Sequence, residues 1–253
     1  AMGITGTDVS KEAADMVLAN DNFATIAAAV REGRVVYDNL KKFILFMLPT
    51  NGGEALVVIA AILFELALPL TAAQVLWINL ATSSTLGLAL AFEPAEQGIM
   101  RRRPRPPGEP LLSGFFVWRV LMVSVLMMTG ALGLFLWELQ QGSSVETART
   151  MAVNAVVMAE MFYLFNSRYI LAPVTNWRGL FGNRYVLWAV GATVLLQLAF
   201  THTAVMHSIF ESTHLSPLEW LKVLGAGLLV FAVAELEKFV IRRTPLASRV
   251  VQA

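Results

Sequence analysis

The sequence predicts an all-α polytopic membrane bundle with six transmembrane helices. Hydrophobic residues make up 57% of the 253 residues and the mean hydropathy is +0.63, whereas soluble domains average about 45–50% apolar. Charged residues are only 15% of the chain, and they gather between long apolar runs. Six of these runs suit helices that cross a bilayer, which takes roughly 20 residues.

The six predicted spans cover 43–64, 72–92, 116–136, 150–165, 186–206 and 221–241. The link between the first two is short and contains Pro69, so these helices form an antiparallel hairpin. Residues 1–40 read as soluble structure, with a helix over 9–18, a turn at 20–22 and an amphipathic helix over 23–40 that runs into the first span. This segment is too small to hold a core of its own.

The distribution of Lys and Arg predicts the orientation. Basic residues concentrate before the first span, in the second and fourth connections and after the last span, while the opposite connections hold only Arg149 and Lys222. The positive-inside rule therefore predicts that both termini are cytoplasmic. The cytoplasmic set is Lys41, Lys42, Arg101, Arg102, Arg103, Arg105, Arg168, Arg178, Arg184, Arg242, Arg243 and Arg249.

Composition also excludes several classes of function. The net charge of +1 gives no bulk attraction to nucleic acid, so no nucleic-acid partner is expected. Cysteine is absent, which excludes disulfides, thiolate metal sites and a catalytic thiol. The candidate functional residues are therefore the polar groups at membrane depth. An ionisable side chain there costs about 2.5–3.5 kcal/mol on insertion scales, so its presence needs a structural or functional reason.

The first polar cluster lies in the span 43–64. Pro49 has no N–H, so the carbonyl of Leu45 loses its helical partner, and the two glycines after Asn51 weaken the helix further. The helix is expected to kink here and expose carbonyl oxygens. Asn51 and Glu54 are three residues apart and share a face, which gives an oxygen-rich site suited to a hard cation. The alternative is a proline kink with helix-packing glycines and a protonated Glu54.

Two further clusters fall near the middle of their spans. Asn79 and Thr82 are also three apart, and Ser83 continues a run of four hydroxyl residues. Such a run equally suits the packing of membrane helices. Glu160 is a carboxylate in the span 150–165, and its alternative role is that of a protonated hydrogen-bond donor.

Two remaining features have simpler explanations. The three histidines, His202, His207 and His214, have spacings of five and seven that match no standard metal pattern, so a solvated loop is favoured. Glu235 and Lys238 are spaced to form a local ion pair.

Several stretches carry a resemblance to a known family. AMGITGTDVSKEAADMVLANDNFATIAAAVREGRVVYDNLKKFILFMLPTNGGE resembles the end of a P-type ATPase phosphorylation domain entering the fifth membrane helix. VLWINLATSSTLGLALAFEPAEQGIMRRRPRPP, AEMFYLFNSR and AELEKFVIRR resemble the type II branch, which includes calcium and sodium/potassium pumps. The resemblance implies that 1–40 is a small α/β remnant of the HAD-like phosphorylation domain with its stalk helix. It also implies that 41–253 is the C-terminal transmembrane domain, holding helices five to ten.

The resemblance also implies which residues coordinate the cation. Ser83 departs from the family pattern, because calcium and sodium/potassium pumps carry an aspartate there, and its loss removes one negative charge. Tyr163 replaces an amide expected one turn after Glu160. The implied cation site consists of Asn51, Glu54, Asn79, Thr82, Ser83 and Glu160.

The function implied is the ion-pathway portion of an ATP-driven pump in the plasma membrane, which holds a hard cation at the bilayer midplane. Its partners would be the lipid bilayer and an upstream half with actuator, nucleotide-binding and phosphorylation domains and four helices. Mg²⁺ and ATP would bind only the intact protein, and this chain alone is expected to be inactive because no phosphorylated-aspartate motif is present. A secondary transporter or channel, or an inert membrane support domain, are the alternatives. The soluble N-terminal segment disfavours the transporter and channel, and the midplane carboxylates disfavour the inert domain.

Overall fold

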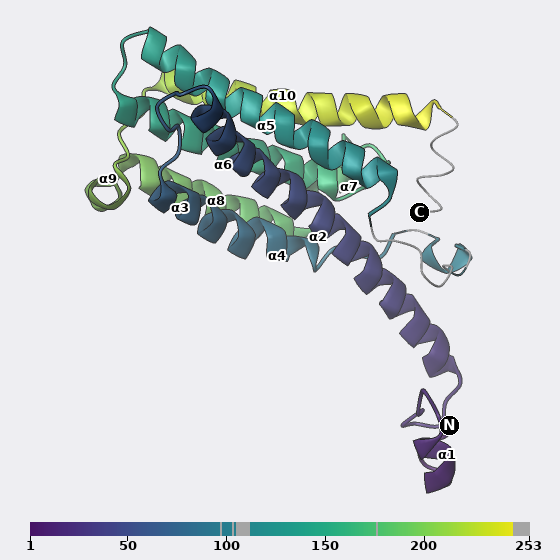
Figure 1. Cartoon of the computed structure of the whole chain (residues 1–253). Coiled ribbons are helices and arrows are strands. Elements are labelled where there is room, and N and C mark those ends of the chain that lie inside the picture. Colours follow the sequence, from purple (N-terminus) through teal and green to yellow (C-terminus); the bar gives the residue numbers. More distant parts are fainter. Residues whose placement is uncertain (97, 103, 105–111, 176, 245–253) are drawn as a thin grey trace.

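The computed structural model describes all residues except 97, 103, 105–111, 176 and 245–253, so Arg103, Arg105 and Arg249 of the predicted cytoplasmic set lie outside the described residues (Figure 1). Every regular element of the described part is a helix or a helical turn. Its elements are α1 (Asp8–Glu12), α2 (Ala24–Leu63), α3 (Ala72–Thr82), a π-helical turn η1 (Ser83–Gly87), α4 (Leu88–Leu90), a 3-10 turn η2 (Ile99–Arg101), α5 (Gly114–Gln140), α6 (Val145–Ser167), α7 (Trp177–Phe181), α8 (Arg184–His202), α9 (Ala204–Phe210) and α10 (Pro217–Arg242).

The N-terminal segment differs from the expected α/β remnant. It contains α1 and a single parallel bridge between Met2 and Leu18, and the described residues form no strand. A strand needs a continuous ladder of backbone hydrogen bonds to a neighbour, and this short segment supplies only one bridge. The helix expected over 9–18 is too long. α1 begins at Asp8, where Thr7 accepts a hydrogen bond from the Ser10 amide, but it ends at Glu12.

The turn predicted at 20–22 is present and is organised by Asp21. Asp21 has a positive φ of 51°. Its Oδ1 accepts from the Ile4 amide at 2.9 Å, and its Oδ2 accepts from the Thr5 amide at 2.8 Å. The carboxylate therefore fastens the start of the chain beside the entrance to α2.

The prediction that the amphipathic segment runs into the first span is confirmed. α2 continues for 40 residues without a break, although Pro49 lies inside it. Figure 1 shows α2 reaching beyond the bundle at the end opposite α9. The hairpin link is also confirmed, because α2 ends at Leu63 and Thr71 caps α3 with a capping box to Gln74.

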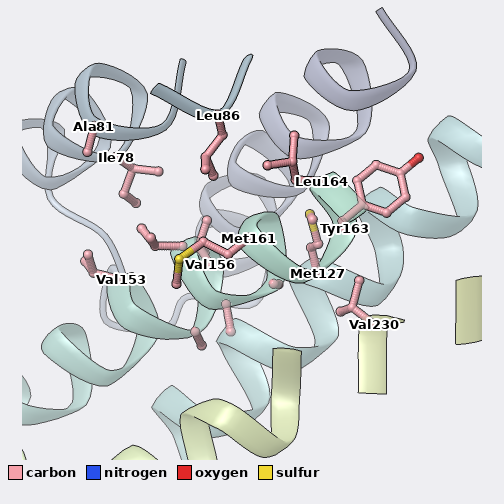
Figure 2. Close-up of a cluster of buried hydrophobic side chains, with 14 of the residues drawn as sticks. Ile78, Ala81, Leu86, Met127, Val153, Val156, Met161, Tyr163, Leu164 and Val230 are labelled. Carbon is pink, nitrogen blue, oxygen red and sulfur yellow. The ribbon is translucent and has the colours of Figure 1, made fainter. Parts of the chain in front are cut away.

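α6 is the central helix of the bundle. Sixteen of its 23 residues are buried, and it contacts α2, α3, α5, α8 and α10. Figure 2 shows its apolar side chains meeting those of three other helices, α3, α5 and α10. The labelled members are Ile78 and Ala81 of α3, Leu86 of η1, Met127 of α5, Val153, Val156, Met161, Tyr163 and Leu164 of α6, and Val230 of α10.

Among the described residues, four helical segments are long and apolar enough to cross a membrane: α2, α5, α8 and the run Ala72–Leu90 formed by α3, η1 and α4. α6 and α10 have 23 and 26 residues, so they have the length of a span. They carry polar or charged groups that lower their hydropathy. A helix surrounded by protein does not need an apolar surface, which fits the burial of α6.

The span predicted over 186–206 is too long. α8 ends at His202, where Thr203 is extended (φ −102°, ψ 138°), and α9 begins at Ala204. The Thr203 hydroxyl donates to the Ala199 carbonyl at 2.8 Å, so a local side-chain bond accompanies the break.

Some of the basic residues that predicted the orientation are buried in ion pairs. Arg168 donates from Nε to Glu93 Oε1 at 2.7 Å, and both side chains are at most 2% exposed. Lys42 lies 3.0 Å from Glu96 and is 1% exposed. These residues therefore brace the bundle at the end from which α2 extends.

Candidate cation site

The centre of the site is a contact between the two arms of the first hairpin. Glu54 of α2 is buried, with 5% of its surface exposed. Its Oε2 accepts a hydrogen bond of 2.8 Å from the Asn79 side-chain amide of α3, and the same amide also donates to the Val75 carbonyl at 3.1 Å. These two residues come together because a short link joins α2 to α3 and because they lie at the same level along the two helices.

Glu160 brings α6 into the same cluster. Glu160 is 1% exposed, and its carboxyl group lies beside the Glu54 carboxyl and the Thr82 hydroxyl. Its Oε2 has no hydrogen-bond partner in the described structure. Thr82 itself donates to the Ile78 carbonyl at 2.9 Å. Two carboxyl groups, one amide and one hydroxyl from three helices therefore meet in the core.

The other two predicted residues are less closely joined to this cluster. Asn51 is exposed on α2, and its amide donates to the Met47 carbonyl at 2.8 Å, within its own helix. Ser83 is half-buried and begins η1, the π-helical turn. Single turns of π-helix are frequent at functional sites, and this one follows Thr82 directly.

The carbonyl oxygens near Pro49 are engaged, in contrast to the expectation that they would be exposed. The Leu45 carbonyl accepts from the Tyr163 hydroxyl at 3.0 Å, and the Pro49 carbonyl accepts from the Ser124 hydroxyl at 2.9 Å. Neighbouring helices thus replace the hydrogen bond that proline removes.

Sequence reasoning did not single out Ser124 of α5. A Cβ atom added at Gly52 would collide with the Ser124 side chain, so the absence of a side chain at Gly52 lets α5 approach α2 closely. The available signal was a hydroxyl residue inside an apolar span together with the paired glycines in α2.

The assembled groups suit a hard cation. Carboxylate, amide and hydroxyl oxygens are the ligands that such ions prefer. Adjacent carboxyl groups repel when both are charged, and a cation or a proton between them removes this repulsion.

Ionisable residues inside a bundle of membrane helices are typical of membrane proteins that carry ions. Residues 67–240 match the family described as "Cation transporting ATPase, C-terminus". The chain belongs to this family and forms the C-terminal membrane region of a P-type cation-transporting ATPase.

Curated relatives agree with this assignment. The chain is 47% identical over 251 residues to the probable cation-transporting ATPase F of Mycobacterium tuberculosis, covering 99% of this chain and 27% of the relative. It is 36% identical to the calcium-transporting ATPase of Bacillus subtilis (89% and 25%) and 34% identical to the human calcium-transporting ATPase type 2C member 1 (96% and 26%). The chain thus spans about a quarter of the length of these relatives.

Proposed function

We propose that this chain forms the ion pathway of an ATP-driven pump of the type II branch and holds the transported cation at the bilayer midplane. The supporting observation is the hydrogen bond between Glu54 and Asn79, which joins α2 to α3, with Glu160 of α6 beside it, so that oxygen ligands from three helices meet in the core. The full proposed set also includes Thr82, Asn51 and Ser83. Asn51 would join when its amide leaves the Met47 carbonyl.

The charge of the cluster limits the charge of the ion that it can bind. Two carboxylates balance one divalent ion, or one monovalent ion if one carboxyl group keeps its proton. Hard cations such as calcium bind six to eight oxygen ligands at about 2.3–2.6 Å, so water or further helices would complete the shell. Two of the relatives are named calcium-transporting ATPases, which makes Ca²⁺ the first ion to test.

The proposed topology has six spans, with α6 and α10 crossing the membrane inside the bundle. In this topology both termini and the second and fourth connections between spans are cytoplasmic, and the membrane is the plasma membrane. The proposed domains are 1–40 and 41–253. The continuous α2 crosses that boundary. From Ala24 to Glu54 it rises about 45 Å at 1.5 Å per residue, so it would transmit movements of cytoplasmic domains to the site.

The proposed partners are the catalytic domains that other parts of such an ATPase supply: actuator, nucleotide-binding and phosphorylation domains with four further helices. Mg²⁺ and ATP would act there. The cation would alternate between the two sides of the membrane as those domains cycle.

Cation uptake into vesicles that carry the full-length pump tests this function. We expect uptake that requires ATP, persists when an uncoupler dissipates the proton gradient, and is abolished by Glu54→Gln. The control is Glu146→Gln, which changes an exposed carboxylate in the first turn of α6. Uptake driven by an ion gradient without ATP would favour a secondary transporter, and wild-type uptake by Glu54→Gln would reject the site.

A further inference from the structure

The three histidines of the chain gather at the α9 end of the bundle, although their spacing had favoured a plain solvated loop. The Nδ1 atoms of His202 and His214 lie 3.1 Å apart. The His207 ring meets the His214 ring edge to face, with centroids 4.6 Å apart. The end of α8, the helix α9 and the link before α10 therefore converge through their imidazoles.

The backbone around these rings is fixed by buried hydrogen bonds. The break at Thr203 turns the chain so that His207 Nε2 lies 2.9 Å from the Thr201 carbonyl. In the link to α10, the Ser212 hydroxyl donates to the Phe200 carbonyl at 2.6 Å and the Thr213 amide donates to the Thr150 hydroxyl at 2.9 Å. His214 is thereby held opposite His202 by contacts to α6 and α8.

The spacing of the two Nδ1 atoms matches a chelate. Zn²⁺ binds imidazole nitrogen at about 2.0–2.1 Å. Two nitrogens 3.1 Å apart therefore subtend an angle of about 100° at one ion, which lies between the angles of square-planar and tetrahedral sites. His202 and His214 are both exposed, so an ion in solution can reach them.

We propose that His202 and His214 bind a borderline divalent transition-metal ion of the Zn²⁺ or Ni²⁺ class, with His207 as a third ligand and water completing the shell. This site is separate from the Glu54 cluster and lies at the opposite end of the bundle from the extension of α2 (Figure 1). Imidazole selects such ions over Mg²⁺ and Ca²⁺. The bound ion would clamp the end of α8 to the start of α10.

Two existing hydrogen bonds must change when the ion binds. Trp220 donates from its indole N–H to His202 Nε2 at 3.4 Å, which assigns the His202 proton to Nδ1, where it is shared with His214. The ion displaces this shared proton and shifts the His202 proton to Nε2, so Trp220 must turn away. His207 must turn its ring before its nitrogen can reach the ion, because the three histidines of the described structure do not converge on one metal position.

The test uses tag-free protein in lipid nanodiscs, labelled with ¹⁵N-histidine and titrated with ZnCl₂ or NiCl₂. Every histidine signal comes from this cluster, because the chain has three histidines and no cysteine. We expect saturable binding of one Zn²⁺, shifts of the Nδ1 signals of His202 and His214, and a change in Trp220 fluorescence. His202→Ala or His214→Ala should weaken binding at least about tenfold, and His207→Ala should weaken it less.

Matched controls make the result decisive. Ser208→Ala changes an exposed residue of α9 and should keep the wild-type affinity, while MgCl₂ and empty nanodiscs should give no response. Circular dichroism should show unchanged helix content in each variant. Wild-type Zn²⁺ affinity in the His202→Ala/His214→Ala double variant, or no saturable binding at all, would overturn the proposal.

Discussion

The Asn79 amide donates a 2.8 Å hydrogen bond to Glu54 Oε2 and thereby joins α3 to α2 at the core of the bundle. A carboxylate that is buried in a membrane helix needs such a partner, because an uncompensated charge there is costly. The same oxygens could instead face a cation if one entered between Glu54 and Glu160. The hydrogen bond from the Asn79 amide thus marks the position at which the proposed cation would bind.

Changing Ser83 to Asp should strengthen the binding of a divalent cation. Ser83 follows Thr82 directly and is half-buried beside the cluster, so a carboxylate there adds one negative charge near the ion. Because Coulomb attraction at such distances amounts to a few kcal/mol at an intermediate dielectric, we expect affinity to rise roughly tenfold or more. Equilibrium ⁴⁵Ca²⁺ binding to the full-length pump measures this.

Ser84→Asp is the matched control, since Ser84 is the next residue and is exposed. It adds the same charge away from the cluster and should leave the affinity unchanged. Equal effects of the two substitutions would mean that Ser83 does not adjoin the ion.

Changing Gly227 to Ala should destabilise the packing of α10 on α6. A Cβ at Gly227 would meet Met158 Cγ at 2.7 Å and Phe162 Cδ2 at 2.6 Å, so these side chains or the helices must shift. Overpacking of this kind costs about 1–3 kcal/mol. Gly225→Ala on the same helix meets no atom within 4 Å and should be neutral. Thermal unfolding in detergent compares them, and equal melting temperatures would refute the close approach.

The proposed topology predicts which positions can be labelled from each side of the membrane. In this cysteine-free chain, a cysteine placed at Gln141 or Ser208 should react with an impermeant maleimide from outside intact cells. A cysteine at Ser10 or Glu32 should react only after the membrane is opened. All four positions are exposed in the structure. The reverse labelling pattern would invert the orientation.

The contact that Asp21 makes with the start of the chain should survive to low pH. The hydrogen bond from the Ile4 amide, followed by that from the Thr5 hydroxyl, lowers the pKa of Asp21 from 3.8 to about 2. Because the folded pKa is depressed, the stabilising contribution is present above pH 3.8 and is lost as the pH falls through about 2.

The Ile4 and Thr5 amide signals, followed by NMR during acidification, test this shift. Their transition should centre near pH 2 and should disappear in Asp21→Asn. A transition centred at the ordinary value of 3.8 would show that the carboxylate does not hold these amides.

Much of the fold follows from residues whose signals are local. The run of the amphipathic segment into the first span and the tight hairpin that ends at Thr71 were predicted from spacing and turn residues, whereas the kink expected at Pro49 does not interrupt α2. The grouping of Glu54 with Asn79 follows from equal depth on two arms of one hairpin. Such features depend on residues that are close in the sequence, so they can be predicted from the sequence alone.

Other features depend on contacts distant in sequence. The engagement of the Leu45 carbonyl by Tyr163 spans 118 residues, and the gathering of His202 with His214 requires the helix break at Thr203. The expected α/β structure at the N-terminus required strand partners that the described residues do not provide. Spacing along one helix could not predict any of these.

The central claim is that one cation lies between Glu54, Asn79 and Glu160. High-resolution cryo-electron microscopy of the full-length pump, with and without saturating Ca²⁺, tests it most directly. We predict Ca²⁺-dependent density about 2.3–2.6 Å from carboxyl oxygens of both Glu54 and Glu160, with the Asn79 amide turned so that its oxygen faces the ion. Ca²⁺-dependent density elsewhere, with the hydrogen bond from Asn79 to Glu54 still intact, would contradict the account.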